Sequence, residues 1–299
     1  MPPPFGEVGG GLMKEITILS GKGGTGKTSI TAALASVAGN AVFCDNDVDA
    51  ADLHLIFDPK IQEEHTFFSG YKATIHDDAC TGCGICYDHC RFDAIHYKEL
   101  GGLYINHFQC EGCRLCERVC PVNAITSERN SNNYWYVSDT RFGKLVHAKM
   151  GPGEENSGKL VSEIRGQAKN IAKETNATHV VNDGPPGIGC AAISSVTGTN
   201  TVLLVIEPTN SGFHDIKRVI DLIDSFKIPS YAVINKYDIN KEVVGEIEEF
   251  LNTNNIPLLA KLPFDKQMVE AMVNGKTIVE YAPDCEISKK IKEVWEKIK

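Results

Sequence analysis

The sequence lacks the marks of a membrane-spanning chain and of a nucleic-acid-binding chain. No run of about 18 consecutive apolar residues occurs, so we expect no transmembrane helix. Basic residues are in deficit, because 30 Lys and Arg stand against 39 Asp and Glu for a formal net charge of −9. Binding to a phosphate backbone needs basic patches instead. We therefore expect a cytoplasmic protein with no nucleic-acid partner, and 299 residues allow one large and one small domain.

Cysteine, by contrast, is abundant, and eight of the eleven cysteines form two runs with the same spacing, C-x2-C-x2-C-x3-C. The runs are Cys80, Cys83, Cys86 and Cys90, and then Cys110, Cys113, Cys116 and Cys120. Disulfides fit this spacing poorly, and no secretory signal is evident. A zinc site is the other alternative, but two C-x2-C pairs would suffice for it. The full spacing is that of ferredoxins with two [4Fe–4S] clusters.

In such ferredoxins the fourth cysteine of each run binds the cluster of the other run. One predicted cluster is therefore held by Cys80, Cys83, Cys86 and Cys120. The other is held by Cys90, Cys110, Cys113 and Cys116. Arg91 stands where a proline usually follows the fourth cysteine; because that proline shapes a turn and is not a ligand, both clusters are still expected.

A glycine-rich segment near the start predicts a phosphate-binding loop. It follows a predicted strand at residues 15–19 and opens a predicted helix at 28–37, and a turn without a ligand is the alternative. Glycines let backbone N–H groups approach phosphate oxygens, Lys27 is expected at the β- and γ-phosphates, and Thr28 is expected to bind Mg²⁺. The expected nucleotide contacts in this loop are Gly21, Lys22, Gly23, Gly24, Thr25, Gly26, Lys27, Thr28 and Ser29.

Alternating strands and helices continue along the chain, with one interruption. Further strands are expected at residues 41–44, 179–181, 201–206, 231–234 and 257–262, and helices at 159–174, 215–226 and 285–299. The fold class is therefore α/β, a doubly wound and mostly parallel P-loop NTPase sheet built from residues 13–65 and 136–299. Residues 66–135 are an inserted α+β ferredoxin-like domain with two clusters. Residues 1–12 are expected to be a disordered leader, and Met13 is an alternative start.

Acidic residues follow two of the predicted strands. Asp45 and Asp49 follow the strand at residues 41–44, and Asp183 follows the strand at 179–181. Carboxylates at the carboxyl ends of parallel strands face the phosphates, where Mg²⁺ needs oxygen acceptors. Asp45 and Asp183 are therefore predicted to support Mg²⁺, and Asp49 to support the metal and the loop. Helix capping is the alternative for Asp45 and Asp49.

Lys22, a second lysine at the start of the phosphate loop, makes the loop resemble that of the MinD/ParA ATPases and the nitrogenase iron protein. With its cysteine runs, nearly the whole chain from residue 13 onward is similar to MinD-superfamily ATPases that contain an inserted ferredoxin domain. The resemblance implies slow, partner-stimulated hydrolysis of ATP in an ATP-dependent homodimer. It implies that Lys22 reaches the partner's γ-phosphate, with a solvated lysine as the alternative, and that Asp47 positions the attacking water. Asp183 would bind Mg²⁺ through water in a mobile loop.

The resemblance also implies a base-binding region of Asn235, Asp238 and Pro263. The phrase N-K-x-D, which begins at Asn235, binds guanine in GTPases, whereas the matching asparagine of MinD-type ATPases contacts adenine. ATP is expected, with GTP as the alternative. Cys190 lies seven residues after Asp183. It is either a cluster ligand near the dimer axis, as in the nitrogenase iron protein, or a small buried thiol.

Two segments admit two interpretations each. The last predicted helix carries apolar residues at helical spacing with lysines between them: Ile287, Ile291, Val294, Trp295 and Ile298. We expect it to pack on the sheet, and the alternative is that it lies on a lipid surface and makes membrane contact. Residues 151–159 either relay the nucleotide state to the insert or cap the following helix.

Three functions fit these motifs. The first is an ATP-dependent dimer switch that transfers electrons through the two clusters to a redox partner that the sequence does not identify. The second is an ATP-dependent scaffold or carrier of iron–sulfur clusters. The third is a MinD-like spatial organiser whose clusters sense redox state.

Overall fold

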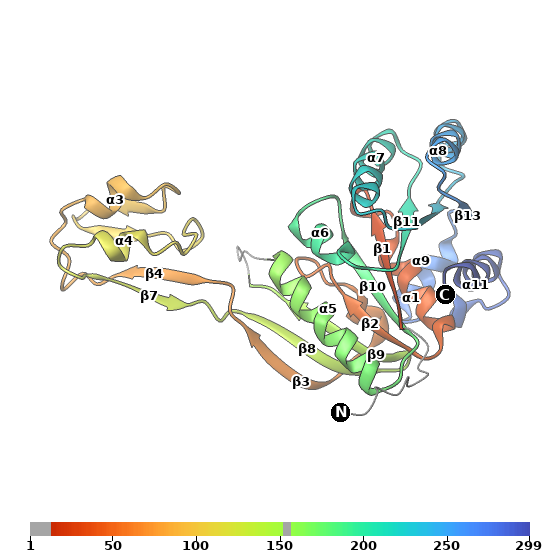
Figure 1. The fold of residues 1–299 in the computed structure, drawn as a ribbon, viewed down its shortest axis with the longest axis horizontal. Coiled ribbons are helices and arrows are strands. Elements are labelled where there is room, and N and C mark those ends of the chain that lie inside the picture. Colours follow the sequence, from red (N-terminus) through yellow and green to blue (C-terminus); the bar gives the residue numbers. More distant parts are fainter. Residues whose placement is uncertain (1–12, 152–156) are drawn as a thin grey trace, which may run out of the picture.

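A nine-stranded sheet forms the centre of the computed structural model, which describes residues 13–151 and 157–299 (Figure 1). The six strands from β13 to β2 and the next strand, β9, run parallel, whereas β8 is antiparallel to both β9 and β3. In sheet order the strands are β13 Leu258–Leu262, β12 Ser230–Asn235, β11 Thr201–Ile206, β1 Lys14–Ser20, β10 His179–Pro186, β2 Ala41–Asp45, β9 Gly143–Lys149, β8 Asn133–Thr140 and β3 Lys60–Phe67.

Helices cover both faces of this sheet. One face packs against α1 Lys27–Ala38, α2 Leu53–Phe57, α9 Lys266–Val273, α10 Ile278–Tyr281 and α11 Glu286–Ile298. The other face packs against α5 Ser157–Glu174, α6 Cys190–Val196, α7 Asn210–Ser225 and α8 Lys241–Thr253. Strands buried on both faces are nearly continuous apolar runs, and the fully buried β11 is apolar after Thr201. The α/β, mostly parallel fold is thus confirmed.

The last helix, α11, packs on the sheet. Its apolar residues at helical spacing are at most 3% exposed and belong to the core that also contains α1. The packing interpretation of this helix is therefore confirmed, because its apolar side is already covered. Within the described ranges, no helix is both long enough and apolar enough to cross a membrane.

Helix α7 begins five residues before the predicted start at residue 215. The Thr209 side chain caps it by accepting a hydrogen bond from the Gly212 backbone N–H. Strand β10 likewise continues to Pro186, past the predicted end at residue 181. Both extensions bring polar residues to the carboxyl edge of the sheet, where ligands bind in open α/β folds.

The cysteine-rich segment stands apart from the large sheet on a two-stranded arm. Strand β4 (Tyr71–Ile75) pairs antiparallel with β7 (Ile125–Arg129), and Figure 1 shows this arm carrying the segment away from the helices. The segment itself contains α3 Ile85–His89, β5 Ile95–Tyr97, β6 Leu103–Ile105 and α4 Leu115–Val119. Strands β3 and β8, which end at Phe67 and begin at Asn133, still belong to the large sheet. We therefore propose that the insert spans residues 68–132, close to the predicted 66–135.

Two predictions fall wholly or partly outside the described residues. The leader at residues 1–12 is one, and most of the segment at 151–159 is the other.

Candidate functional site

The phosphate loop lies between β1 and α1 and needs glycine at two positions. Gly24 and Gly26 have φ angles of 78° and 88°, in the left-handed region that L side chains rarely adopt. A side chain at Gly26 would also strike the amide nitrogen of Asn235. The local sequence thus imposes the loop, and α1 begins directly after it at Lys27.

Lys27 and Thr28 are bound to Asp183 at the end of β10. The Lys27 ammonium lies 2.8 Å from one Asp183 carboxylate oxygen, to which the Thr28 hydroxyl also donates at 2.7 Å. Thr31 donates to the other oxygen at 2.6 Å. Burial lowers the pKa of Lys27, but Asp183 more than offsets this, so its pKa is raised and the amine stays charged. The hydroxyl and carboxylate are the oxygen ligands that Mg²⁺ prefers, so this pair fits the predicted metal position.

The three other acidic residues predicted near the site, Asp45, Asp47 and Asp49, differ in burial and in their position relative to the cavity. Asp45 is fully buried, and its carboxylate accepts hydrogen bonds from the backbone N–H groups of Asp47 at 3.2 Å and Leu53 at 3.0 Å. Burial and the Asp183 charge hold the pKa of Asp45 well above its usual value. Asp47 lines the cavity beside the loop, 3.9 Å from Lys27, and burial raises its pKa to about 6. Asp49 is exposed and lies outside the residues that line this cavity.

Lys22 is held within its own chain by Glu207, a residue that the sequence analysis did not identify. Its ammonium lies 2.9 Å from the Glu207 carboxylate and 2.9 Å from the Thr209 hydroxyl. The other Glu207 oxygen lies 2.7 Å from Lys236, which also donates to the Gly24 carbonyl at 3.0 Å. Burial raises the pKa of Glu207, but the two lysines outweigh this and lower it. The structure thus contradicts the interpretation of Lys22 as a freely solvated lysine. The feature of the sequence that could have indicated Glu207 is its position directly after β11.

The predicted base-binding residues take different positions. The Asn235 side chain donates to the Thr25 carbonyl at 2.8 Å, so it braces the phosphate loop from the end of β12. Asn235 and Pro263 line the cavity, whereas Asp238 accepts a hydrogen bond from the Phe264 N–H at 2.7 Å and does not line it. Contact of Asn235 with adenine therefore stays a prediction.

The cavity beside the phosphate loop has a volume of about 690 Å³, within the usual range for small-molecule sites. Its polar lining comprises the phosphate loop and Asp47 among others. Its apolar lining includes Leu55, Ile56, Met268, Val269 and Met272 from α2 and α9. Sequence reasoning missed α9 entirely, although its apolar residues recur at helical spacing. A ligand with a charged end and a flat apolar end fits this shape.

In the insert, the cysteines surround two separate cavities. One is lined by Cys90, Cys110, Cys113 and Cys116, and the other by Cys80, Cys83, Cys86 and Cys120. These are the two sets predicted from the crossover of the fourth cysteines. Backbone N–H groups also point at the crossover sulfurs, with Ala94 donating to Cys90 at 3.4 Å and Ala124 to Cys120 at 3.2 Å. Each cavity therefore has four thiols in its lining, which is the number of ligands that a [4Fe–4S] cluster takes.

The two halves of the insert share one backbone design. Gly82 and Gly112 both have φ of 67°, and Asp93 and Asn123 have φ of 50° and 52°. The Cys110-containing half lies against the arm, since Lys72 of β4 donates to the Cys110 carbonyl at 3.0 Å. We call the cavity of Cys90, Cys110, Cys113 and Cys116 the near site, and the cavity of Cys80, Cys83, Cys86 and Cys120 the far site.

Cys190 is exposed at the start of α6, so its interpretation as a small buried thiol is wrong. The preceding strand ends in a glycine-rich turn that leaves the residue at the surface. A cluster role for Cys190 stays a prediction.

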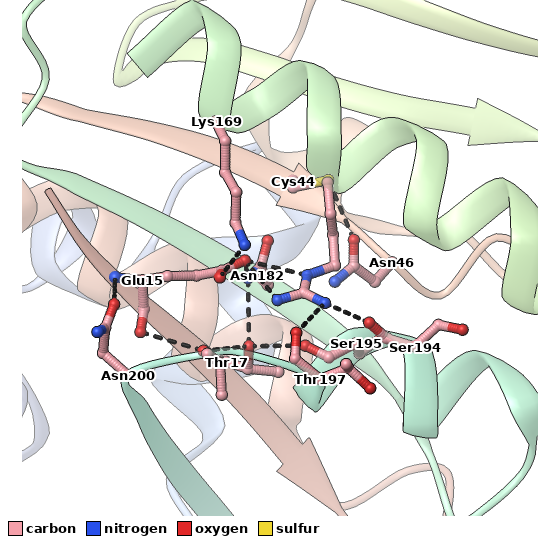
Figure 2. A network of polar contacts seen from close by, with 12 residues as sticks. Glu15, Thr17, Cys44, Asn46, Lys169, Asn182, Ser194, Ser195, Thr197 and Asn200 are labelled. Carbon is pink, nitrogen blue, oxygen red and sulfur yellow. Dashed lines mark hydrogen bonds and ion pairs between the residues drawn. The ribbon is translucent and has the colours of Figure 1, made fainter. Parts of the chain in front are cut away.

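Below the site, a buried polar network joins four elements (Figure 2). Glu15 of β1 is 1% exposed and pairs with Arg165 of α5 at 2.7 Å, with Lys169 at 2.7 Å and with the Asn182 amide of β10 at 2.8 Å. Arg165 also donates to the Ser194 and Thr197 carbonyls at α6. Since Asn182 precedes Asp183, the network ties α5 and α6 to the strand that carries Asp183.

Comparison with known proteins agrees with this geometry. The family model of the CobQ/CobB/MinD/ParA nucleotide binding domain matches residues 16–278. An uncharacterized protein of Methanocaldococcus jannaschii is 34% identical over 97% of this chain and 98% of its own length. The MinD septum site-determining protein of Pyrococcus horikoshii, solved with Mg-ADP, has a TM-score of 0.57 at 18% identity and covers 96% of each chain.

Shorter matches concern iron–sulfur proteins. A ferredoxin of Pyrobaculum islandicum is 33% identical over 25% of this chain and 72% of its own length. An iron–sulfur cluster carrier protein of Rickettsia conorii is 27% identical over 38% of this chain and 36% of its own. The chain therefore belongs to the CobQ/CobB/MinD/ParA family of nucleotide-binding ATPases, as a MinD-type member with a ferredoxin-like insertion.

Proposed function

We propose that this ATPase is a nucleotide-dependent switch for electron transfer through two [4Fe–4S] clusters, and that its ATP-bound form is a homodimer. The observation that carries the proposal is the sorting of the eight cysteines into two sets of four, each around its own cavity. Each cluster, when bound, supplies one-electron chemistry. The second support is position, since the insert follows β3, which itself comes after the loop at residues 45–49 and α2 in the chain.

The chain's own residues supply the nucleotide chemistry. Lys27 would neutralise the β- and γ-phosphates, and Thr28 and Asp183 would hold Mg²⁺. For this, the present hydrogen bonds of Lys27 and Thr28 to Asp183 have to break. Asp47, with a pKa of about 6, can accept a hydrogen bond from the attacking water near neutral pH. Lys22 would leave Glu207 and contact the γ-phosphate of the partner protomer.

The test is an EPR-monitored redox titration of anaerobically purified protein with and without ATP and Mg²⁺, with Lys27→Ala as the control. We expect ATP to shift the midpoint potential by about 60 mV or more, which is roughly 1.4 kcal/mol for a one-electron couple. Lys27→Ala should abolish the shift. Two intact clusters whose midpoint potentials are the same with and without ATP would contradict the proposed switch.

A second candidate, an ATP-dependent carrier of iron–sulfur clusters, is favoured by the likeness to the carrier protein of Rickettsia conorii. Transfer of labelled iron to an apo-acceptor separates the two functions. Rapid ATP-dependent transfer supports a carrier, whereas retention of all iron through many ATPase turnovers supports electron transfer.

A further inference from the structure

We propose that the surface beside the far site is a docking surface for an electron-transfer protein with a basic face. This far patch is defined by Asp77, Asp78, Tyr87, Asp88, Tyr97, Glu99 and Leu100, all of which are exposed. The proposal rests on the proposed function, because it supplies the class of partner with which the clusters exchange electrons.

The far patch is continuous. The Lys98 ammonium lies 2.6 Å from both carboxylate oxygens of Asp77, which places the β5–β6 turn against the segment that leads to Cys80. The rings of Tyr87 and Tyr97 lie 5.1 Å apart, which places α3 against β5. Four carboxylates therefore face solvent with one lysine among them, beside the exposed Cys83.

The other half of the insert is an internal control for these charges. Thirty residues separate equivalent positions, as Cys80 and Cys110 show. At the positions of Asp77, Asp78 and Asp88 the near half carries His107, Phe108 and Arg118. Because both halves adopt the same backbone, folding of the cysteine loops does not need these three aspartates. Their negative charge at one end of the insert calls for another explanation.

The apolar part of the far patch has the character of an interface centre. Tyr87 is 45% exposed, Tyr97 58%, and Leu100 is fully exposed at the β5–β6 turn. Tyrosine is enriched in protein interfaces, whereas an acidic rim steers and orients a basic partner. Electron-transfer encounters bury less than about 1,200 Å², so such a partner needs only a small contact surface.

The far site can be reached from this surface, because Cys83, one of its four cysteines, is exposed. Cys80, Cys83, Cys86 and Cys120 would hold a cluster at the far site, and when reduced it would supply one electron to a one-electron acceptor of the partner, such as a ferric haem. No bond forms or breaks and no proton moves, so the oxidised cluster and the reduced acceptor balance.

The experiment measures binding of cytochrome c, a basic haem protein, to the immobilised oxidised holoprotein by surface plasmon resonance. The test variant is Asp77→Asn/Asp78→Asn/Asp88→Asn, and the matched control is Glu242→Gln/Glu246→Gln/Glu249→Gln on α8, with the same change in charge. We expect the test variant to raise the Kd at least tenfold at low ionic strength and to flatten its salt dependence. The control should change the Kd less than twofold.

Equal effects of the two triple variants, or no effect of either, would overturn the proposal. Visible absorption and iron content establish that each variant holds its clusters. If the test variant loses iron, a second variant replaces it in the experiment, Glu99→Gln/Leu100→Ser, whose residues lie on the turn away from all cysteines. We expect this second variant to raise the Kd threefold. Because binding is measured on oxidised protein without nucleotide, its outcome is independent of the ATP-dependent potential shift that tests the proposed function.

Discussion

Replacing Glu207 with glutamine is expected to promote the ATP-dependent dimer, because Glu207 holds Lys22 inside its own protomer. The contact joins two charged groups at 2.9 Å, with side chains 27% and 12% exposed for Lys22 and Glu207. Lys22 has to leave it before it can reach a phosphate on the partner. The ion pair therefore opposes dimerisation by the free energy that holds Lys22 in place.

The size of the effect follows from this geometry. Hydrogen bonds between charged groups contribute about 1.5–3 kcal/mol. Partial exposure reduces this to about 1–2 kcal/mol for one Lys22. Two protomers release two lysines, so the cost per dimer is about 2–4 kcal/mol. Glutamine keeps a neutral hydrogen bond, and we therefore expect the dimer Kd to fall by about tenfold to a hundredfold, at about 1.4 kcal/mol per tenfold.

Sedimentation equilibrium with a non-hydrolysable ATP analogue measures this Kd. The same change in a Lys22→Ala background is the decisive control, because an effect that acts through Lys22 disappears there. Because Glu207→Gln also weakens the ion pair of Glu207 with Lys236, the variant Lys236→Met serves as the control for the loss of that pair. A Kd that is unchanged or higher in Glu207→Gln, or a gain that persists in the Lys22→Ala background, refutes the reasoning.

Three further predictions concern stability. Because the pKa of Asp47 is raised in the folded state, the nucleotide-free protein should lose stability as pH rises from about 4 to about 6. Asp47→Asn should therefore raise the free energy of unfolding at pH 7.5 by up to about 3 kcal/mol, measured by denaturant unfolding. The same variant should have no ATPase activity. Gly112→Ala should cost about 1–3 kcal/mol more than Gly82→Ala in the same unfolding assay, because φ is equal but only Gly112 packs on the Tyr71 backbone. Ile291→Ala should cost about 2–5 kcal/mol, since α11 lies in the core; a smaller loss would contradict that packing.

Local patterns determined what the sequence could predict. Strand β11 was predicted with its exact bounds, because both faces are covered and all its residues after Thr201 are apolar. The two cysteine sets were predicted because a fixed spacing encodes their connectivity. Strand β3 was missed for the opposite reason. It lies at the sheet edge with Lys60, Glu63 and Glu64 exposed, so it carries no apolar periodicity.

Long-range contacts were the other limit. Glu207 and Lys22 are far apart in the sequence, and nothing local to either residue indicates the pair. The same holds for Glu15, whose burial at the start of β1 depends on Arg165 from α5. A lone glutamate in a strand is ordinarily taken for a surface residue. Its partner becomes evident only when the sheet places α5 across β1 and β10.

That arrangement gives α5 a particular position between the nucleotide site and the arm. Its middle is fixed to β1 and α6 through Arg165, and Lys169 of the same helix joins Glu15 beside Asn182 of β10, the strand that carries Asp183 (Figure 2). Its first turns lie at the root of the arm, where Lys159 and Glu163 line a cavity with Tyr71. Removing one partner of a buried ion pair costs about 3–5 kcal/mol, so the pair of Glu15 and Arg165 holds α5 against β1. We therefore expect a rearrangement around Asp183, when Lys27 and Thr28 exchange it for phosphate and metal, to reach the arm through α5.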